Sequence, residues 1–262
     1  MYRLLVKGLK QVVQIVDDDV TEFLVGEEMN NIKILNDDSE SLSILVDSNG
    51  KLSYIGEFNG VKKRLKEEGI DMEKLKVIDS KGGIAIPGFV DGHSHPVFAG
   101  DRVHEFAMKL AGATYMEISK KMLRSGTTTL EAKSGYGLNV DAEMKMLRVL
   151  STENPSIPLE VSATFCGAHA VPKGSTEAEQ TRMICDELIP KIEAEKRNGG
   201  LRNVENIDVF CEKGVFEVES SQKILKRGQE AGMAVNFHAE ELKYIGGVEM
   251  GAKIGVSFIH FL

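Results

Sequence analysis

The sequence PGFVDGHSHP, residues 87–96, follows directly on the apolar run Ile84–Ile86 and ends in an Asp-x-His-x-His pattern. Residues two apart on a β-strand project from the same face of a sheet. His93 and His95 can therefore both point at one metal ion from the end of a strand. The alternative interpretation is a pair of solvent-exposed loop histidines. The pattern alone leaves both open, so the remaining ligands have to come from elsewhere in the chain.

The composition is that of an ordinary soluble globular protein, with 262 residues, 42% hydrophobic and 27% charged. The formal net charge of -8 argues against a nucleic-acid partner and against attraction to an anionic membrane. No apolar run approaches the length of a membrane span, and the first residues form no signal peptide. The three cysteines, Cys166, Cys185 and Cys211, include no Cys-x-x-Cys pair. We therefore expect a reduced, cytoplasmic protein.

Residues 1–86 predict a small, mostly β domain without a cluster of catalytic or ligand residues. Residues 2–16 alternate weakly between apolar and polar positions, and residues 17–41 are polar and acidic. Two apolar runs flank the turn sequence around Asn49 and Gly50, which is a strong signal for a β-hairpin. Mixed charges over residues 60–74 predict a solvent-exposed helix.

After residue 87 the pattern changes to strands that alternate with helices. Strands are predicted at 127–131, 159–165, 207–211 and 234–238, and helices at 140–151, 176–197, 220–232 and 243–254, with Ser220 as an N-cap. This alternation predicts an α/β fold with a parallel sheet, either a TIM-like (β/α)8 barrel or an open doubly wound sheet. Polar side chains follow the strands: His93, His95, Lys133, Tyr136, His169, Glu212, His238 and Glu241. No Gly-rich phosphate loop follows the first strand, which favours the barrel.

His238 is the third candidate metal ligand. With His93 and His95 it would form a hydrolytic metal site that keeps an open position for water. Glu241 is our candidate for proton transfer, because a carboxylate three residues past a ligand can reach that water. The alternatives are a core histidine at position 238, and a helix first turn that favours negative charge at Glu240 and Glu241.

Several further residues could contact a substrate. Arg102, in the loop after the first strand, could hold a substrate carboxylate, or form a surface ion pair with Asp101 or Glu105. Hydrogen bonds to a polar substrate could come from Tyr115, Tyr136 and His169. His104 is interpreted as a surface residue, and Lys133 as an interior charge of the barrel without a defined role.

Six stretches of this sequence resemble one family. The opening sequence at 87–96 resembles that of the metal-dependent amidohydrolase superfamily. Five others narrow the resemblance to the imidazolonepropionases, most closely the animal forms: RVHEFAMKLAGATYMEI (102–118), KSGYGL (133–138), GAHAVP (167–172), DVFCEKGVF (208–216) and NFHAEEL (236–242). The resemblance runs from about residue 80 to residue 257.

The resemblance implies hydrolysis of the cyclic amide of 4-imidazolone-5-propanoate to N-formimidoyl-L-glutamate, a step of histidine degradation. It implies one zinc or iron ion, a small-molecule substrate and, for full-length members, a homodimer. By position, the family's metal histidines match His93, His95 and His238. Residues that contact substrate or intermediates match Arg102, Tyr115, Tyr136, His169 and Glu241.

The chain departs from the family at two places. Residues 119–124 are too few for the crossover that the family has after Ile118, so we expect an internal segment to be missing. The last barrel strands, with the family's metal-binding aspartate, would lie beyond Leu262, and His260 does not match the family's next histidine. We therefore expect an incomplete (β/α)8 TIM-like barrel over residues 87–262, a small β-sandwich-type domain over residues 1–86, and a chain that is inactive alone. A non-catalytic fragment and a phosphoesterase-type metal hydrolase are the alternatives.

Overall fold

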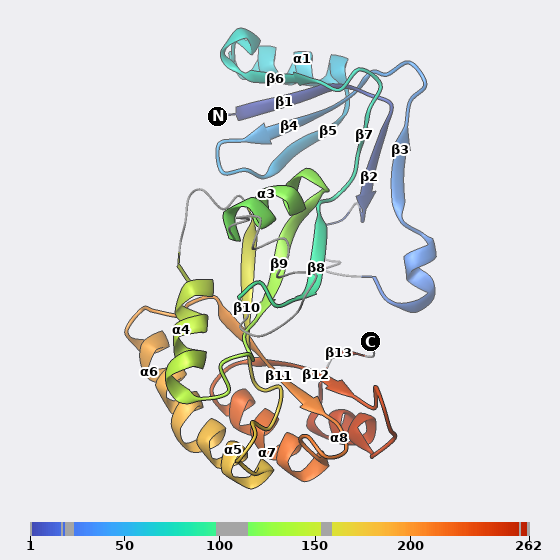
Figure 1. Ribbon diagram of the computed structural model, residues 1–262. Coiled ribbons are helices and arrows are strands. Elements are labelled where there is room, and N and C mark those ends of the chain that lie inside the picture. The colour runs from blue at the N-terminus through green and yellow to red at the C-terminus, as the bar shows by residue number, and fades with distance from the viewer. Residues whose placement is uncertain are drawn as a thin grey trace. The chain divides into compact units, whose positions relative to one another are not determined.

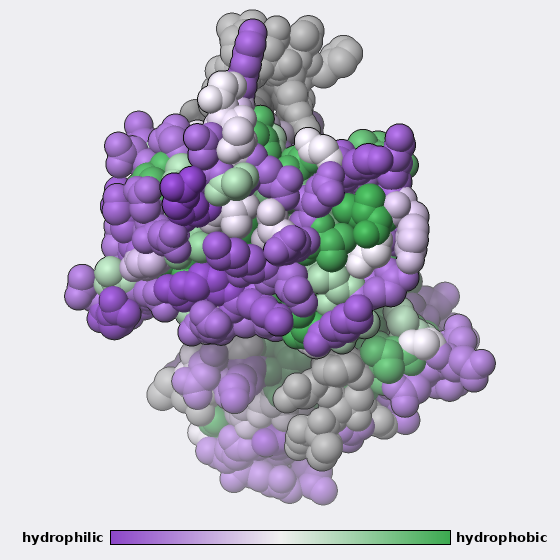
Figure 2. Space-filling model, turned by 90° about the horizontal axis from the view of Figure 1, so that it is seen from below, coloured by the Kyte–Doolittle hydropathy of each residue, from purple (hydrophilic) through white to green (hydrophobic). Residues whose placement is uncertain are grey.

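The computed structural model describes residues 2–16, 18, 24–97, 115–152, 159–256 and 258–260, and for 115–119 and 258–260 the backbone only. The chain divides into two compact units, Met1–Pro87 and Gly88–Leu262 (Figure 1). In the part of the chain that is described, no helix has both the length and the apolar character needed to cross a membrane. The surface in Figure 2 is mainly hydrophilic, with apolar patches between the polar groups.

The first unit contains two sheets. A four-stranded sheet has the order β5-β4-β1-β6, and a three-stranded sheet has the order β3-β2-β7. The elements are β1 (Tyr2–Leu9), β2 (Gln11–Ile15), the short 3-10 helix η1 (Gly26–Asn30), β3 (Lys33–Asn36), β4 (Leu42–Asp47), β5 (Leu52–Glu57), α1 (Phe58–Glu67), the 3-10 helix η2 (Met72–Lys74), β6 (Lys76–Asp79) and β7 (Ile84–Ala85). The predicted hairpin around Asn49 and Gly50 is confirmed, since β4 and β5 pair antiparallel.

The predicted exposed helix is present but is shorter than its charge pattern indicated, and it is not wholly solvated. Helix α1 ends at Glu67, and its residues Val61 and Leu65 are buried. They pack with Leu5 and Leu45 of the four-stranded sheet into one apolar cluster. The charged residues of the segment thus form only the outer face of a helix that covers this sheet.

The second unit is built on a six-stranded sheet in which every neighbouring pair is parallel. The strand order is β13-β12-β11-β10-β9-β8, so each new strand is added beside the one before it. The elements are β8 (Phe89–Ser94), α3 (Tyr115–Arg124), β9 (Thr127–Lys133), α4 (Val140–Leu150), β10 (Glu160–Ala168), α5 (Glu177–Met183), the π-helical turn η3 (Ile184–Leu188), α6 (Ile189–Arg197), β11 (Val204–Cys211), α7 (Val218–Glu230), β12 (Ala234–Ala239), α8 (Gly247–Ile254) and β13 (Phe258–His260).

Alternation along these strands separates an apolar face from a polar one. The apolar side chains belong to the large cluster beneath the helices and include Ala132, Phe165, Val209 and Phe237. The polar side chains are on the opposite face, and their mutual contacts place them in the interior of the curved sheet: Glu131, Lys133, Thr164, Asp208 and His238.

The sheet curls into part of a barrel. Strands β8 and β12 are four strand spacings apart in the sheet order, which is about 19 Å in a flat sheet. Side-chain nitrogens of His93 on β8 and His238 on β12 are nevertheless 3.2 Å apart. The predicted α/β fold with an incomplete parallel barrel is therefore confirmed, and among the described residues β8 and β13 form the two edges of the sheet.

The connection from β8 to β9 includes a helix. Residues 119–124 are too few for a crossover by themselves, but here they are the second half of helix α3, which begins at Tyr115. Helix α3 leads directly into β9, and β9 pairs parallel with β8. Residues 115–118 of the 102–118 motif thus form the first part of the helix that leads into β9.

Two details of the helices also differ from the prediction. Ser220 is not the N-cap of α7, because the helix begins at Val218 with Glu217 in the cap position. The predicted helix over 176–197 is divided into α5, the π-helical turn and α6, and Pro190 lies in the first turn of α6. A wider turn before Pro190 accommodates a residue that has no N–H to donate to the preceding turn.

Candidate functional site

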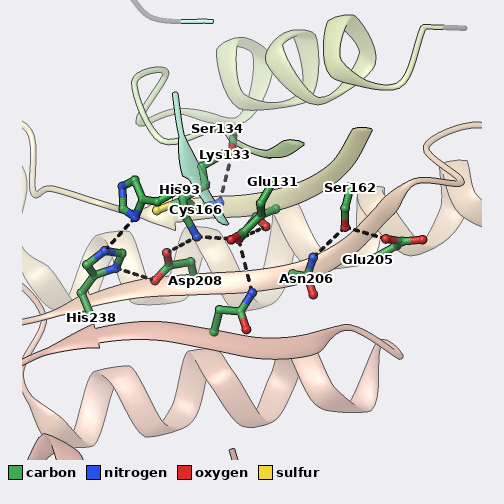
Figure 3. A network of polar contacts seen from close by, with 12 residues as sticks. His93, Glu131, Lys133, Ser134, Ser162, Cys166, Glu205, Asn206, Asp208 and His238 are labelled. Carbon is green, nitrogen blue, oxygen red and sulfur yellow. Dashed lines mark hydrogen bonds and ion pairs between the residues drawn. The ribbon is translucent and has the colours of Figure 1, made fainter. Parts of the chain in front are cut away.

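Two histidines meet at the carboxyl ends of β8 and β12. The Nε2 atom of His238 lies 3.2 Å from Nδ1 of His93, and the two rings are nearly perpendicular, with their centroids 4.8 Å apart (Figure 3). Two imidazole nitrogens bound to one tetrahedral zinc ion are about 3.4 Å apart. The spacing of this pair therefore fits two ligands of a single metal ion.

The orientation of His238 is set by Asp208 on the neighbouring strand β11. Nδ1 of His238 lies 3.1 Å from Oδ1 of Asp208, whose side chain is fully buried. An ionised carboxylate can only accept a hydrogen bond, so the neutral ring carries its proton on Nδ1. The lone pair of Nε2 is then directed toward His93. A histidine held in this way by a carboxylate is typical of metal sites in proteins.

A buried ion network lies behind Asp208. The ammonium group of Lys133, which is completely buried, lies 2.9 Å from Oδ2 of Asp208 and 2.5 Å from Oε1 of Glu131 (Figure 3). Burial by itself would lower the pKa of Lys133, but the charges of Asp208 and Glu131 outweigh it and raise that pKa. Burial likewise opposes ionisation of Asp208, yet the hydrogen bond from His238 and the charge of Lys133 lower its pKa. Lys133 and Asp208 are therefore both charged at neutral pH.

His95 belongs to a second group of rings beside this pair. Its ring stacks on His169 at a centroid distance of 5.0 Å and meets Tyr136 edge-on at 5.2 Å. The Nδ1 atom of His95 is buried and has no well-formed hydrogen bond within the described residues. Burial, followed by the charges of His169 and His93, lowers the pKa of His95 to about 4. His95 is consequently neutral at physiological pH, which is the form that binds metals.

His169 and Tyr136 lie beside His95 and contact each other. Nδ1 of His169 lies 2.9 Å from the carbonyl oxygen of Gly135, to which it donates in its neutral form. Its Nε2 atom is then the acceptor. Tyr136 packs edge-on against both His95 and His169. The predicted substrate residues of the 133–138 and 167–172 motifs thus come together beside His95.

The three histidines predicted as metal ligands are only partly assembled. Within the ranges that the structure describes, no group of three or more His, Cys, Asp or Glu side chains forms a metal-binding arrangement. Ring nitrogens of His93 and His238 are 3.2 Å apart, whereas His95 meets the ring of His93 edge-on at 5.4 Å between centroids and stacks on His169. Arg102 lies outside the described residues, and Tyr115, the first residue of α3, is described by its backbone only.

Glu241 lies in a loop whose backbone is held by two other carboxylates. Glu212, buried at the end of β11, accepts hydrogen bonds from the backbone N–H groups of Leu242 and Lys243 at 2.9 and 3.0 Å. Glu240 accepts hydrogen bonds from backbone N–H groups at the start of α8, including that of Gly246 at 2.8 Å. The helix-start interpretation therefore holds for Glu240, while Glu241 is exposed between the two anchored points.

Sequence reasoning missed two members of the site, Asp208 and Glu131. A signal was present, because each carboxylate interrupts a strand whose neighbouring residues are apolar, as in Ile207-Asp208-Val209. In a strand with one face under helices, such a residue is directed toward the interior of a barrel.

Comparison with curated proteins gives close relatives over the whole chain. A protein of Nematostella vectensis named "Probable imidazolonepropionase" is 42% identical over 292 aligned positions, which cover 100% of this chain and 67% of the relative. A protein of Danio rerio with the same name is 40% identical over 290 positions, covering 100% of this chain and 65% of the relative. The chain thus spans about two thirds of the length of these relatives. None of the protein-family models matches it.

The first alignment also bears on the missing internal segment. It has 292 positions whereas the chain has 262 residues, so at least 30 positions face a gap in this chain. At least 30 positions of the relative thus have no counterpart in this chain within the aligned region, and the position of the missing segment after Ile118 stays a prediction.

The chain is also similar in fold to solved structures. A Xaa-Pro dipeptidase has a TM-score of 0.59 and 16% identity, with 98% of this chain and 60% of that chain covered. An uncharacterized metal-dependent hydrolase from Pyrococcus horikoshii OT3 has a TM-score of 0.50 and 12% identity, with 97% and 74% covered. At these identities the likeness shows the fold alone. The relatives, 42% and 40% identical along the full chain, place it more narrowly: it belongs to the imidazolonepropionase family.

Proposed function

We propose that the site of this chain serves hydrolysis of the cyclic amide of 4-imidazolone-5-propanoate to N-formimidoyl-L-glutamate. The names of the relatives and the six family stretches support this reaction. The structural observation that carries it is the contact of His93 with His238, behind which Asp208 binds the other nitrogen of His238.

A zinc or iron ion is the cofactor that we propose for this site, with His93, His95 and His238 as its protein ligands. Neutral imidazole nitrogens are suitable ligands for both metals. When bound, the ion would lower the pKa of a water molecule and polarise the ring carbonyl. Two of the three ligands fit this role by their spacing, and the low pKa of His95 keeps the third available as a neutral donor.

The remaining residues bind the substrate and move protons. Tyr136 and His169, beside His95, would hydrogen-bond the polar ring. Arg102 would hold the propanoate carboxylate, and Tyr115 would contribute a further hydrogen bond. Glu241, on the loop anchored by Glu212, would take a proton from the attacking water and return one to the ring nitrogen that leaves.

We propose that the 262-residue chain alone hydrolyses this substrate slowly or not at all. Within the described residues the sheet keeps two separate edges, β8 and β13, and only His93 and His238 of the predicted ligands have ring nitrogens as close as 3.2 Å. An incompletely closed barrel leaves water free to enter the interior and leaves the ligands less firmly held.

The test compares two proteins for loss of imidazolone absorbance and for bound zinc or iron. One is the 262-residue chain, and the other is the same chain carrying the segments that the Nematostella vectensis relative has in addition. We expect turnover in the extended protein and its loss in the Arg102→Ala variant. Absence of turnover in an extended, folded and metal-loaded protein would refute the proposed reaction. Clear turnover by the 262-residue chain would refute its inactivity.

A further inference from the structure

Lys133 is the only cation in the buried polar contact between β9 and β11 that Figure 3 shows among the described residues. Its side chain is fully buried, and its ammonium group lies between the carboxylates of Glu131 and Asp208. A buried ammonium group is costly to desolvate, and replacing such an ion group by apolar residues is often neutral or stabilising. Stability alone is therefore a weak reason for a lysine at this position.

The two oxygens of Asp208 have different partners. Oδ2 accepts from Nζ of Lys133 at 2.9 Å, and Oδ1 accepts from Nδ1 of His238 at 3.1 Å. A carboxylate of an aspartate can rotate about its last side-chain bond, whose torsional preference is broad. Because Lys133 holds one oxygen, the other oxygen is fixed toward the ring of His238.

Lys133 is itself anchored from the other side. Oε1 of Glu131, which binds the ammonium group, also accepts from the hydroxyl of Thr164 and from Nδ2 of Asn236 at 3.3 Å. These partners lie on β10 and β12, so the network connects four successive strands, β9 to β12, across the curved interior. Lys133 is thus held between Asp208 and a Glu131 side chain that is itself fixed from β10 and β12.

We propose that Lys133 is a positioning residue for the metal site, acting through Asp208 on His238. Its ammonium group orients the Asp208 carboxylate, the carboxylate holds the proton of His238 on Nδ1, and the lone pair of Nε2 of His238 then faces His93, where the metal would bind. This inference deepens the proposed function and rests on it for the identity of the metal ligands.

Two variants remove the ammonium group. Lys133→Met keeps the length of the side chain, but leaves Glu131 and Asp208 as two unbalanced carboxylates and can prevent folding. The double variant Glu131→Gln/Lys133→Met keeps the summed charge of the three side chains at its original value and is the second arm. Arg227→Met is the matched control, because it removes an ion pair with Glu193 that joins α7 and α6 away from the histidines.

The measurements are made on the full 262-residue chain without substrate. Nitrogen-15 NMR at pH 8 reports the tautomer of His238, assigned by the signals that disappear in His238→Gln. Equilibrium titration with zinc gives the affinity, and circular dichroism confirms folding. We expect the Nδ1–H tautomer in the unmodified chain and in Arg227→Met, and a tautomer mixture in the folded Lys133 variants, with zinc affinity about 10–100-fold lower.

A folded Lys133 variant with an unchanged tautomer and unchanged zinc affinity overturns the inference. Equal loss of zinc affinity in Arg227→Met also overturns it, because the effect would then be one of general stability. Failure of the proposed reaction is seen separately: an extended, zinc-loaded protein with the Nδ1–H tautomer that does not consume imidazolone refutes the reaction and leaves the positioning role of Lys133 intact.

Discussion

The buried carboxylate of Glu212 accepts the backbone N–H of Leu242 at 2.9 Å, and this bond ties the end of β11 to the loop that follows β12. A second bond, from the N–H of Lys243 to the other carboxylate oxygen, fixes the same loop at the next residue. The loop has no regular secondary structure, and a side chain from the end of the neighbouring strand fixes the conformation of its backbone.

Replacement of Glu212 by Gln is expected to loosen this loop. The amide has one acceptor oxygen where the carboxylate has two, so one of the two backbone N–H groups loses its charged partner. The free energy of unfolding should fall by about 1–3 kcal/mol. Hydrogen exchange of Leu242 and Lys243 should accelerate, as measured by mass spectrometry or NMR. Glu219→Gln, on the exposed surface of α7, is the control and should change neither quantity. Unaltered exchange in Glu212→Gln would contradict the anchoring role.

Zinc is expected to stabilise the folded chain through His93 and His238. At a free zinc concentration 100 times the dissociation constant, the gain is about 2.7 kcal/mol, or roughly 5–10 °C in the melting temperature. A chelator should remove the gain. His93→Gln and His238→Gln should abolish it, while His104→Gln, a residue interpreted from the sequence as exposed, should retain it. Full retention of the gain in His238→Gln would exclude that residue as a ligand.

Gly135 is expected to tolerate no side chain. Its φ angle is +112°, and a Cβ atom there would lie 2.7 Å from the carbonyl oxygen of Cys166 and 3.0 Å from Cβ of His169. Backbone strain and overpacking should together cost Gly135→Ala about 2–5 kcal/mol in urea unfolding.

The control for this variant is Gly174→Ala. Gly174 also has a positive φ, +91°, but no atom lies within 4 Å of a Cβ placed there. Only the strain of a left-handed backbone remains, about 1–2 kcal/mol. Equal losses in the two variants would show that the close approach to His169 has no energetic consequence.

Acid sensitivity of the first unit is expected to depend on Asp37. Hydrogen bonds from the hydroxyls of Ser39 and Ser41 lower the pKa of Asp37 far below its ordinary value of 3.8. Because the folded-state pKa is the lower one, this contribution to stability is complete above about pH 4 and is lost as the pH falls further. Between pH 4 and pH 2, Asp37→Asn should therefore lose less stability than the unmodified chain, as followed by circular dichroism. Parallel acid profiles would refute the assignment.

The sequence predicted the strands and helices well, but it did not predict how far the parallel sheet curls. Alternation and turn residues were sufficient for the hairpin at Asn49 and for β9 to β12, because these signals are local. The contact between His93 and His238 depends on how far the sheet curls, which no spacing in the sequence measures. The stacking of His95 on His169 also depends on how the strands pack in three dimensions, and no local sequence pattern predicts it.

Asp208 and Glu131 were missed for a related reason. The role of a carboxylate inside a strand depends on which side chain it contacts in the fold. Here that side chain is Lys133, and the sequence gives no sign that Lys133 would contact Asp208, which lies 75 residues later. Glu240 illustrates the opposite case: the preference of a helix start for negative charge is local, and it was one of the interpretations that the sequence offered.

Strand β8, which carries His93, has a consequence for handling the protein. Among the described residues it pairs with β9 on one side only, and Phe89 and Val90 are 54% and 68% exposed. Unpaired N–H and C=O groups beside bulky apolar side chains are a template for the same strand of another molecule. Storage at high concentration should therefore favour β-sheet-rich aggregates in which β8 of one molecule pairs with β8 of another. Val90→Lys should slow this aggregation and extend the shelf life of the preparation.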